Sequence, residues 1–135
     1  MENQVKSKLR FVNYKVMEVH LKQNEKFEND GKPIDVKSTL RHHTDIKENN
    51  MKIKLEIVVF DNAEENNFPF YLRTVLEGEF EIEGDDIEKF EINGISLLYP
   101  YARSIISTYT ANSNIPTLVL PPINVINYYK STKKS

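Results

Sequence analysis

The spacing of the apolar residues changes once along this chain, and the change limits the folds that it can adopt. Up to about residue 82, apolar residues recur at alternate positions, and the clearest example is Lys52–Phe60. This alternation is typical of a β-strand. After Asn93-Gly94 the spacing becomes that of one helix face, at Leu98, Ala102, Ile105, Ile106 and Tyr109. Strands followed by a helix predict an α+β domain.

Three further segments are predicted as strands, at residues 9–21, 35–46 and 70–82. Short or polar loops without a helical period join the four strands, which indicates an antiparallel sheet. The first strand has apolar residues at both parities, such as Phe11 and Met17 on one and Val12 and Tyr14 on the other. We therefore expect both of its faces to be covered, in part by another subunit.

The C-terminal third is predicted as a long helix followed by an apolar loop. Pro100 cannot donate a backbone hydrogen bond, so we expect it near the start of the helix. Residues 112–114 and Pro116 are expected to end the helix. The apolar loop Ile115–Tyr129 contains three prolines, which argue against a regular helix or a central strand. A short basic tail, Lys130–Ser135, completes one domain over residues 1–135 with its core at about 9–129.

The composition argues against several classes of function. A net charge of −2 does not favour nucleic acid as a partner, which requires clustered Lys and Arg. The absence of cysteine excludes disulfides and thiolate metal sites. No apolar run approaches the roughly 18–20 residues of a membrane span, and the polar N-terminus does not resemble a signal peptide. We therefore expect a cytoplasmic protein that does not insert into membranes.

The side chains capable of catalysis or metal binding do not form a recognisable pattern. His42 and His43 are adjacent, so they would point to opposite faces of a strand, and His20 is distant in sequence. The pair Gly31-Lys32 lacks the rest of a phosphate-binding loop. Serines near the helix lack a nucleophile elbow: Ser96, Ser104 and Ser107. We expect neither an enzyme nor a cofactor nor a bound metal.

A long run in the last third consists of LYPYAR at 98–103, then Ile106-Ser107, then NIPTLVLPPIN at 114–124. This run resembles the SecB family of bacterial export chaperones. The upstream order of four strands is also similar to that family. The resemblance implies a homotetramer, a dimer of dimers with its helices between two sheets. It also implies apolar grooves that hold non-native polypeptides before they pass to the translocase ATPase SecA.

The resemblance also implies roles for individual residues. A groove for unfolded polypeptides would use Ile115, Leu118, Val119, Leu120, Ile123, Tyr128 and Tyr129. Subunit interfaces would use Tyr71, Arg73, Val75, Tyr99, Tyr101, Ile105 and Tyr109. A contact with SecA would involve Glu18 and Leu72. The alternative for the loop is packing on its own core. From their helical spacing, Tyr99, Tyr101 and Tyr109 are expected in the core or a subunit interface, and the alternative is contact with the bound polypeptide.

The chain departs from the family pattern where SecA would bind. By the same comparison Lys22 and Thr74 stand at positions that are acidic in the family, and the tail is basic rather than acidic. The acidic run Glu77–Glu91 is either a replacement contact or a solvated strand end and turn. Three hypotheses follow: an ATP-independent holding chaperone (holdase) for protein export, a dedicated SecB-like chaperone of an antitoxin, and a non-chaperone adaptor that scaffolds a fixed partner.

Overall fold

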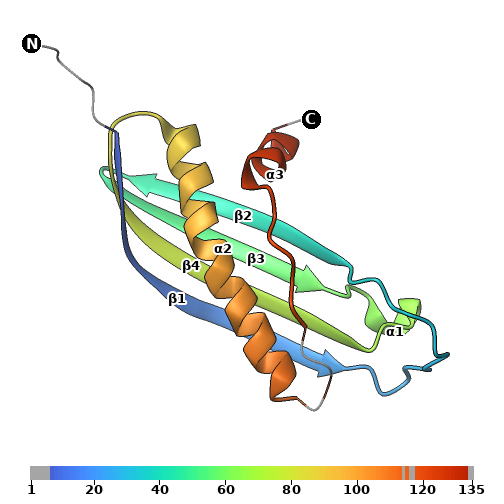
Figure 1. Cartoon of the computed structure of the whole chain (residues 1–135). Helices are drawn as coiled ribbons and strands as arrows, with labels where there is room; N and C mark the ends of the chain where they lie inside the picture. Colours follow the sequence, from blue (N-terminus) through green and yellow to red (C-terminus); the bar gives the residue numbers. More distant parts are fainter. Residues whose placement is uncertain (1–6, 114, 116–117, 134–135) are drawn as a thin grey trace, which may run out of the picture.

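The computed structural model describes residues 7–113, 115 and 118–133. Its elements are β1 (Lys8–Gln23), β2 (Ser38–Lys47), β3 (Asn50–Val59), α1 (Ala63–Asn66), β4 (Phe70–Glu83), α2 (Ile87–Ala111) and α3 (Val125–Thr132). The four strands form one antiparallel sheet in the order β1-β4-β3-β2, and α2 lies across one face of it (Figure 1). The predicted α+β class and four-stranded sheet are confirmed. No helix in these described ranges is long and apolar enough to cross a membrane.

β1 contains two register shifts, between Phe11 and Asn13 and between Val16 and Glu18. Each bulge inserts one residue and so reverses the face on which the following side chains lie. Phe11 and Tyr14, which have opposite parity, consequently pair with Phe80 and Gly78 on the helix-covered face. The prediction that β1 is apolar on both faces was wrong, because the first bulge brings Phe11, Tyr14 and Val16 onto the same, helix-covered face.

The core lies between α2 and the two central strands, and two glycines set its spacing. A Cβ atom at Gly94 of α2 would lie 2.6 Å from Ile53 Cδ1, and one at Gly78 of β4 would lie 2.6 Å from Leu98 Cδ2. Glycine at these contacts lets the helix backbone approach the sheet closely. Asn93-Gly94 therefore lies inside α2, whereas the sequence analysis placed it before the helix.

α2 begins earlier than expected and contains Pro100 in its interior. The side chain of Asp86 caps its N-terminus by accepting a hydrogen bond from Lys89 N at 3.2 Å. Pro100 and Ser96, whose carbonyl loses its helical partner, both lie on the exposed side of the helix. Water can hydrogen-bond to that carbonyl, so the proline is tolerated there. The predicted end is confirmed, with Asn112 as the C-cap; Pro116 lies outside the described residues.

The end of the predicted apolar loop is helical. α3 starts directly after Asn124, whose side chain caps it by accepting a hydrogen bond from Asn127 N at 2.9 Å. Every proline of the loop precedes this cap, so none of them opposes the helix that follows. The prediction of an irregular segment up to Tyr129 was wrong for residues 125–129, and part of the basic tail belongs to α3.

Candidate functional site

One face of α2 holds the segment that follows the helix by its backbone atoms. The bonds are Tyr99 hydroxyl to Pro121 carbonyl (2.9 Å), Arg103 Nε to Leu120 carbonyl (2.9 Å), Ser107 Oγ to Leu118 carbonyl (2.8 Å) and Leu118 N to Thr110 Oγ1 (2.9 Å). The four helix residues recur at a spacing of three or four, which puts them on one face. Because the contacts use main-chain atoms, they fix the path of residues 118–121 without depending on the side chains of that segment.

The side chains of this segment differ in exposure. Val119 is 70% exposed, whereas the next residue, Leu120, is 2% exposed and belongs to the core. Leu118, Ile123 and Ile115 are half-buried. Tyr128 is also half-buried, but Tyr129 is buried. In this arrangement Leu120 and Tyr129 stabilise the protomer and are not accessible to an unfolded polypeptide, contrary to the prediction.

Leu118 and Ile115 line an apolar hollow of about 440 Å³ at one end of the sheet, which we call the aromatic hollow. Its walls come from the β1–β2 connection, the end of β3, the start of β4 and the α2–α3 connection. The apolar residues that line it are Phe27, Ile34, Phe60, Pro69, Phe70, Ile115 and Leu118. The sequence predicted only the last two, because the others are distant along the chain and belong to loops and strand ends.

Phe60 in this wall has a strained backbone. Its φ is 56°, in the left-handed region that bulky residues rarely adopt. A hydrogen bond from Phe60 N to the Lys37 carbonyl (2.9 Å) holds it, and its ring packs against Phe68 and Phe70 with centroids 4.8 and 5.1 Å apart. Strain of this kind costs on the order of 1–3 kcal/mol and is often found at functional sites. Phe60, Phe68 and Phe70 lie within eleven residues of the chain, which is the sequence feature that could have indicated this cluster but was not part of the prediction.

A second hollow of about 390 Å³ lies between α2 and the chain that leads to α3. Ile123 lines it together with Ile92, Pro100, Pro122 and Val125. The structure thus separates the predicted polypeptide contacts into two groups, with Ile115 and Leu118 in the aromatic hollow and Ile123 in the second. The segment 118–122, with exposed Val119, connects the two hollows.

The predicted interface residues fall on different faces. Tyr101 and Tyr109 are exposed on α2, Ile105 is half-buried, and Tyr99 is buried by its contact with Pro121. Tyr101 also packs against Tyr14 of β1, with ring centroids 4.4 Å apart. Exposed apolar side chains continue from this pair, and we call the set the edge surface: Tyr14, Val16, Leu97 and Tyr101.

The remaining predicted interface residues, Tyr71, Arg73 and Val75, lie on β4 and face away from α2. Val75 is nearly buried, and Arg73 forms ion pairs with Glu18 of β1 and Glu56 of β3. A single flat interface therefore cannot contain both these residues and the α2 tyrosines.

The two residues of the predicted contact with SecA lie on opposite faces of the sheet. Glu18 is exposed on the outer face, but Leu72 is fully buried on the helix-covered face. Thr74 is also buried on that face, at 1% exposure, so it cannot occupy a surface position that the family uses for a partner. Leu72 and Thr74 were assigned to the wrong face.

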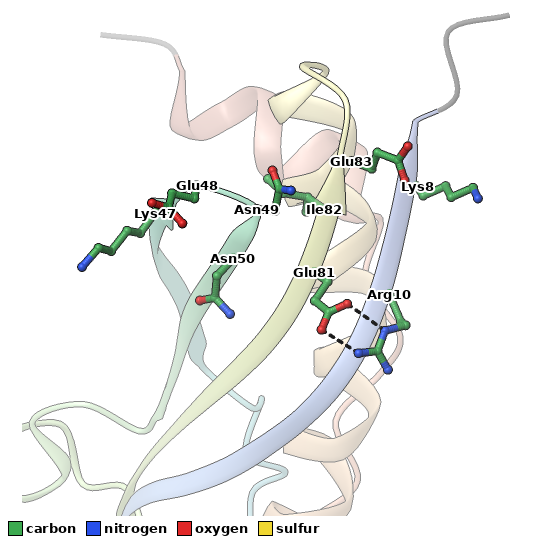
Figure 2. A pocket seen from close by; sticks show the side chains of 9 residues that line it. All are labelled: Lys8, Arg10, Lys47, Glu48, Asn49, Asn50, Glu81, Ile82 and Glu83. Atoms are coloured by element: carbon green, nitrogen blue, oxygen red, sulfur yellow. Dashed lines mark hydrogen bonds and ion pairs between the residues drawn. The ribbon is translucent and has the colours of Figure 1, made fainter.

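Four glutamates of the acidic run, at alternate positions from Glu77 to Glu83, form a row along the outer face of β4. Arg10 of β1 forms two hydrogen bonds with Glu81, at 2.6 and 3.1 Å (Figure 2). Asn50 of β3 donates to Glu79 at 2.7 Å. The residues that line the hollow of about 610 Å³ beside this pair are charged or carry an amide, except for Ile82. Such a lining is poorly suited to apolar segments.

β2 places its two histidines on opposite faces, as predicted from their adjacency. His42 faces α2 and α3 and is largely buried, and His43 is exposed. Within the part of the chain that the structure describes, no three His, Asp or Glu side chains are arranged to hold a metal.

Comparison with known proteins identifies the family. A family model described as preprotein translocase subunit SecB matches residues 2–135. The chain belongs to the SecB family. Protein MJ0357 of Methanocaldococcus jannaschii is 37% identical over 134 residues, 93% of this chain and 84% of that protein. The protein-export protein SecB of Alcanivorax borkumensis is 33% identical over 88 residues, 62% of this chain and 55% of that protein.

Solved structures share the fold of this SecB-family chain. The Mycobacterium tuberculosis SecB-like chaperone Rv1957, solved with a ChAD peptide from the HigA1 antitoxin Rv1956, matches with a TM-score of 0.68 and 11% identity. The match covers 86% of this chain and 91% of that chain. A protein of unknown function from Streptococcus agalactiae matches with a TM-score of 0.53 and 12% identity, covering 87% and 99% of the two chains. Family membership together with this fold supports a chaperone role.

Proposed function

We propose that this chain is an ATP-independent holdase that binds extended, apolar segments of non-native polypeptides in the cytoplasm and keeps them competent for export. The observation that carries the proposal is the pair of hollows joined by segment 118–122. Their walls are mainly apolar, and the connecting Val119 is 70% exposed. The proposed activity is binding and requires no catalytic group.

The exposed apolar surface favours weak binding of polypeptides that differ in sequence. Exposed apolar side chains continue from the aromatic hollow into the β1–β2 connection, where Ile34 and Val36 are each more than 40% exposed. Covering apolar surface contributes roughly 25 cal/mol per Å² regardless of the order of residues in the bound segment. Several such sites in one assembly would bind a long unfolded chain together through their high effective concentration.

The proposed assembly is a homotetramer, built as a dimer of dimers. The edge surface (Tyr14, Val16, Leu97 and Tyr101) and Tyr109 expose large apolar side chains along β1 and α2. Exposed apolar patches of this kind commonly mark subunit contacts. The outer-face residues Tyr71 and Arg73 would require a separate contact, since they lie on the other side of the sheet.

A second candidate function is that of a dedicated chaperone for an antitoxin. The observation that favours it is the similar fold of Rv1957, a SecB-like chaperone solved with an antitoxin peptide. The corrected outer face also leaves Glu18 as the one predicted SecA contact that is exposed. A dedicated chaperone would bind one partner far more tightly than unrelated unfolded proteins, whereas a non-chaperone adaptor would bind no unfolded protein.

The test is the affinity for a permanently unfolded protein, fluorescently labelled, reduced and carboxymethylated α-lactalbumin. The double variant Ile34→Ser/Leu118→Ser removes apolar side chains from two walls of the aromatic hollow. We expect its Kd to rise roughly tenfold or more, since each lost contact contributes on the order of 1 kcal/mol.

The matched control is Ile46→Ser, which removes an exposed apolar side chain of β2 that lines neither the aromatic hollow nor the second hollow. We expect it to bind like the wild type. Equal affinities for all three proteins, each folded, would show that this hollow is not the binding site.

A further inference from the structure

A largely buried carboxylate joins three elements at the β2 side of the sheet. Glu91 of α2, 8% exposed, accepts hydrogen bonds from Thr44 Oγ1 of β2 and from the Tyr129 hydroxyl of α3, both at 2.7 Å. His42 Nε2 of β2 lies 3.4 Å from the same carboxylate. Three groups from two other elements thus converge on one charged side chain.

The network extends from His42 to the neighbouring tyrosine of α3. His42 Nδ1 lies 2.7 Å from the Tyr128 hydroxyl, and the His42 ring stacks on Tyr129 with centroids 5.9 Å apart. Because Glu91 can only accept, a neutral His42 carries its proton on Nε2, and its Nδ1 accepts from Tyr128. All four groups are then satisfied, so the network holds α3 against β2 and α2.

The chain before α3 is anchored separately. The carbonyls of Leu120 and Pro121 are bonded to Arg103 and Tyr99 of α2, and α3 begins only after Asn124. Between these two attachments, Pro122 and Ile123 border the second hollow. Release of the Glu91 network would therefore free α3 without detaching segment 118–121.

We propose that α3 is a releasable cover clasped to the sheet by Glu91, and that its release enlarges the apolar surface available to unfolded polypeptides. The groups that release exposes are the apolar side chains of α3 and the β2 side chain that packs on them. Tyr129 is buried, Val125 and Tyr128 are partly buried against the core, and His42 packs against both tyrosines. This inference deepens the proposed holdase function and rests on it.

The ionisable groups of the clasp, His42 and Glu91, make its stability depend on pH. Burial lowers the pKa of His42 below its ordinary value of 6.5, against the pull of Glu91. Burial alone would raise the pKa of Glu91, but the hydrogen bonds from Thr44 and Tyr129 and the nearby His42 outweigh it, so this pKa lies below 4.5. Because the pKa of each group is lowered in the closed form, each group stabilises that form at pH values above its ordinary pKa. This stabilisation is lost as the pH falls through the lowered pKa.

Neighbouring charged groups other than Glu91 also lower the pKa of His42. His43 of β2 and Lys133 after α3 both disfavour a positive charge on His42. Glu88 of α2 carries a further negative charge near Tyr129, and burial together with the Glu91 bond raises the pKa of that tyrosine, so it stays protonated. The clasp should therefore loosen as the pH falls below 6.5, and further below 4.5.

Amide hydrogen exchange of α3 in the full-length protein tests the clasp, because exchange rates report local opening. After correction for intrinsic rates, we expect α3 of the wild type to exchange several-fold to roughly tenfold faster at about pH 5.5 than at about pH 7.5. Glu91→Gln and Tyr129→Phe should each accelerate exchange already at about pH 7.5. His42→Phe should abolish the pH dependence between these values, whereas the matched variant His43→Phe should retain it.

Binding of labelled unfolded α-lactalbumin under the same conditions tests the consequence. We expect affinity to rise several-fold wherever α3 exchange rises. Unchanged α3 exchange in both Glu91→Gln and Tyr129→Phe would overturn the clasp, as would an unaltered pH dependence in His42→Phe. If α3 exchanged faster but unfolded α-lactalbumin bound with unchanged or weaker affinity, the proposal that α3 covers a binding surface would be refuted. No binding by any protein at either pH would refute the holdase proposal, while the exchange data would still decide the clasp.

Discussion

Two neighbouring residues, Val119 and Leu120, should respond to mutation in opposite ways. Val119 is 70% exposed, and Leu120 is 2% exposed in the core, although the two are adjacent in one extended segment. Replacement of Leu120 by Ala should lower the free energy of unfolding by about 2–5 kcal/mol, the usual cost of a cavity left by a buried leucine. Replacement of Val119 by Ser should change it by less than about 0.5 kcal/mol.

The effect on binding should be reversed. Full burial of a valine side chain contributes about 1.5 kcal/mol or more, and the 70% that is exposed leaves roughly 1 kcal/mol for contact with a bound polypeptide. Val119→Ser should therefore weaken binding of unfolded α-lactalbumin about fivefold per site. Leu120→Ala should bind like the wild type under conditions in which it is fully folded.

Urea unfolding followed by circular dichroism, and fluorescence anisotropy with the labelled polypeptide, measure the two effects on the same samples. Val119→Ser serves as the stability control for Leu120→Ala, and Leu120→Ala serves as the binding control for Val119→Ser. If Val119→Ser destabilised the protein as strongly as Leu120→Ala, or left the affinity unchanged, the separation of core and binding residues along this segment would be wrong.

Three further predictions concern stability and assembly. Thr74 Oγ1 is buried and, within the described residues, has no hydrogen-bond partner. Thr74→Val should therefore stabilise the protein by about 1 kcal/mol in urea unfolding. Thr110→Val removes the acceptor of Leu118 N and should destabilise the protein by about 1–3 kcal/mol. The reverse order would contradict this reasoning. Gly78→Ala should cost about 1–3 kcal/mol because Leu98 must move from the added methyl, and an unchanged unfolding midpoint would refute that tight contact. Light scattering should give a mass of four times 15.8 kDa, about 63 kDa, and a monomer at micromolar concentration would refute the tetramer and its multivalent binding.

The sequence predicted the elements that have a regular apolar period. β3 and β4 match the predicted segments within about two residues, because alternation is strong where one face is fully buried. β1 was correctly predicted as a strand, but its residues were assigned to the wrong faces. The bulges at Val12 and Met17 shift the alternation, and the apolar pattern alone does not reveal them.

The helix boundaries do not follow from single glycine and proline residues. Gly94 and Pro100 indicated a late start for α2, yet tertiary contacts decided otherwise: Gly94 fits against Ile53, and Pro100 sits on the exposed side. The sequence did not predict α3, because the prolines argue against a helix only up to Pro122, whereas α3 begins after Asn124.

The candidate site was predicted in part. The apolar loop contributes to both hollows, but its individual residues divide between surface and core according to contacts with α2 that have no signature in the sequence. The aromatic hollow also depends on Phe27, Phe60 and Phe70, which only the fold brings together. The role of Glu91 requires knowledge that β2 and α3 meet beside the start of α2.

The measurement that tests the holdase proposal most directly is suppression of aggregation without nucleotide. Several unrelated proteins, chemically unfolded and diluted into buffer, would be followed by light scattering with and without the chain. The proposal predicts that near-stoichiometric amounts suppress the scattering of each protein. It also predicts that Ile34→Ser/Leu118→Ser suppresses the scattering less, while Ile46→Ser does not differ from the wild type. A folded chain that suppresses aggregation of none of these proteins would contradict it.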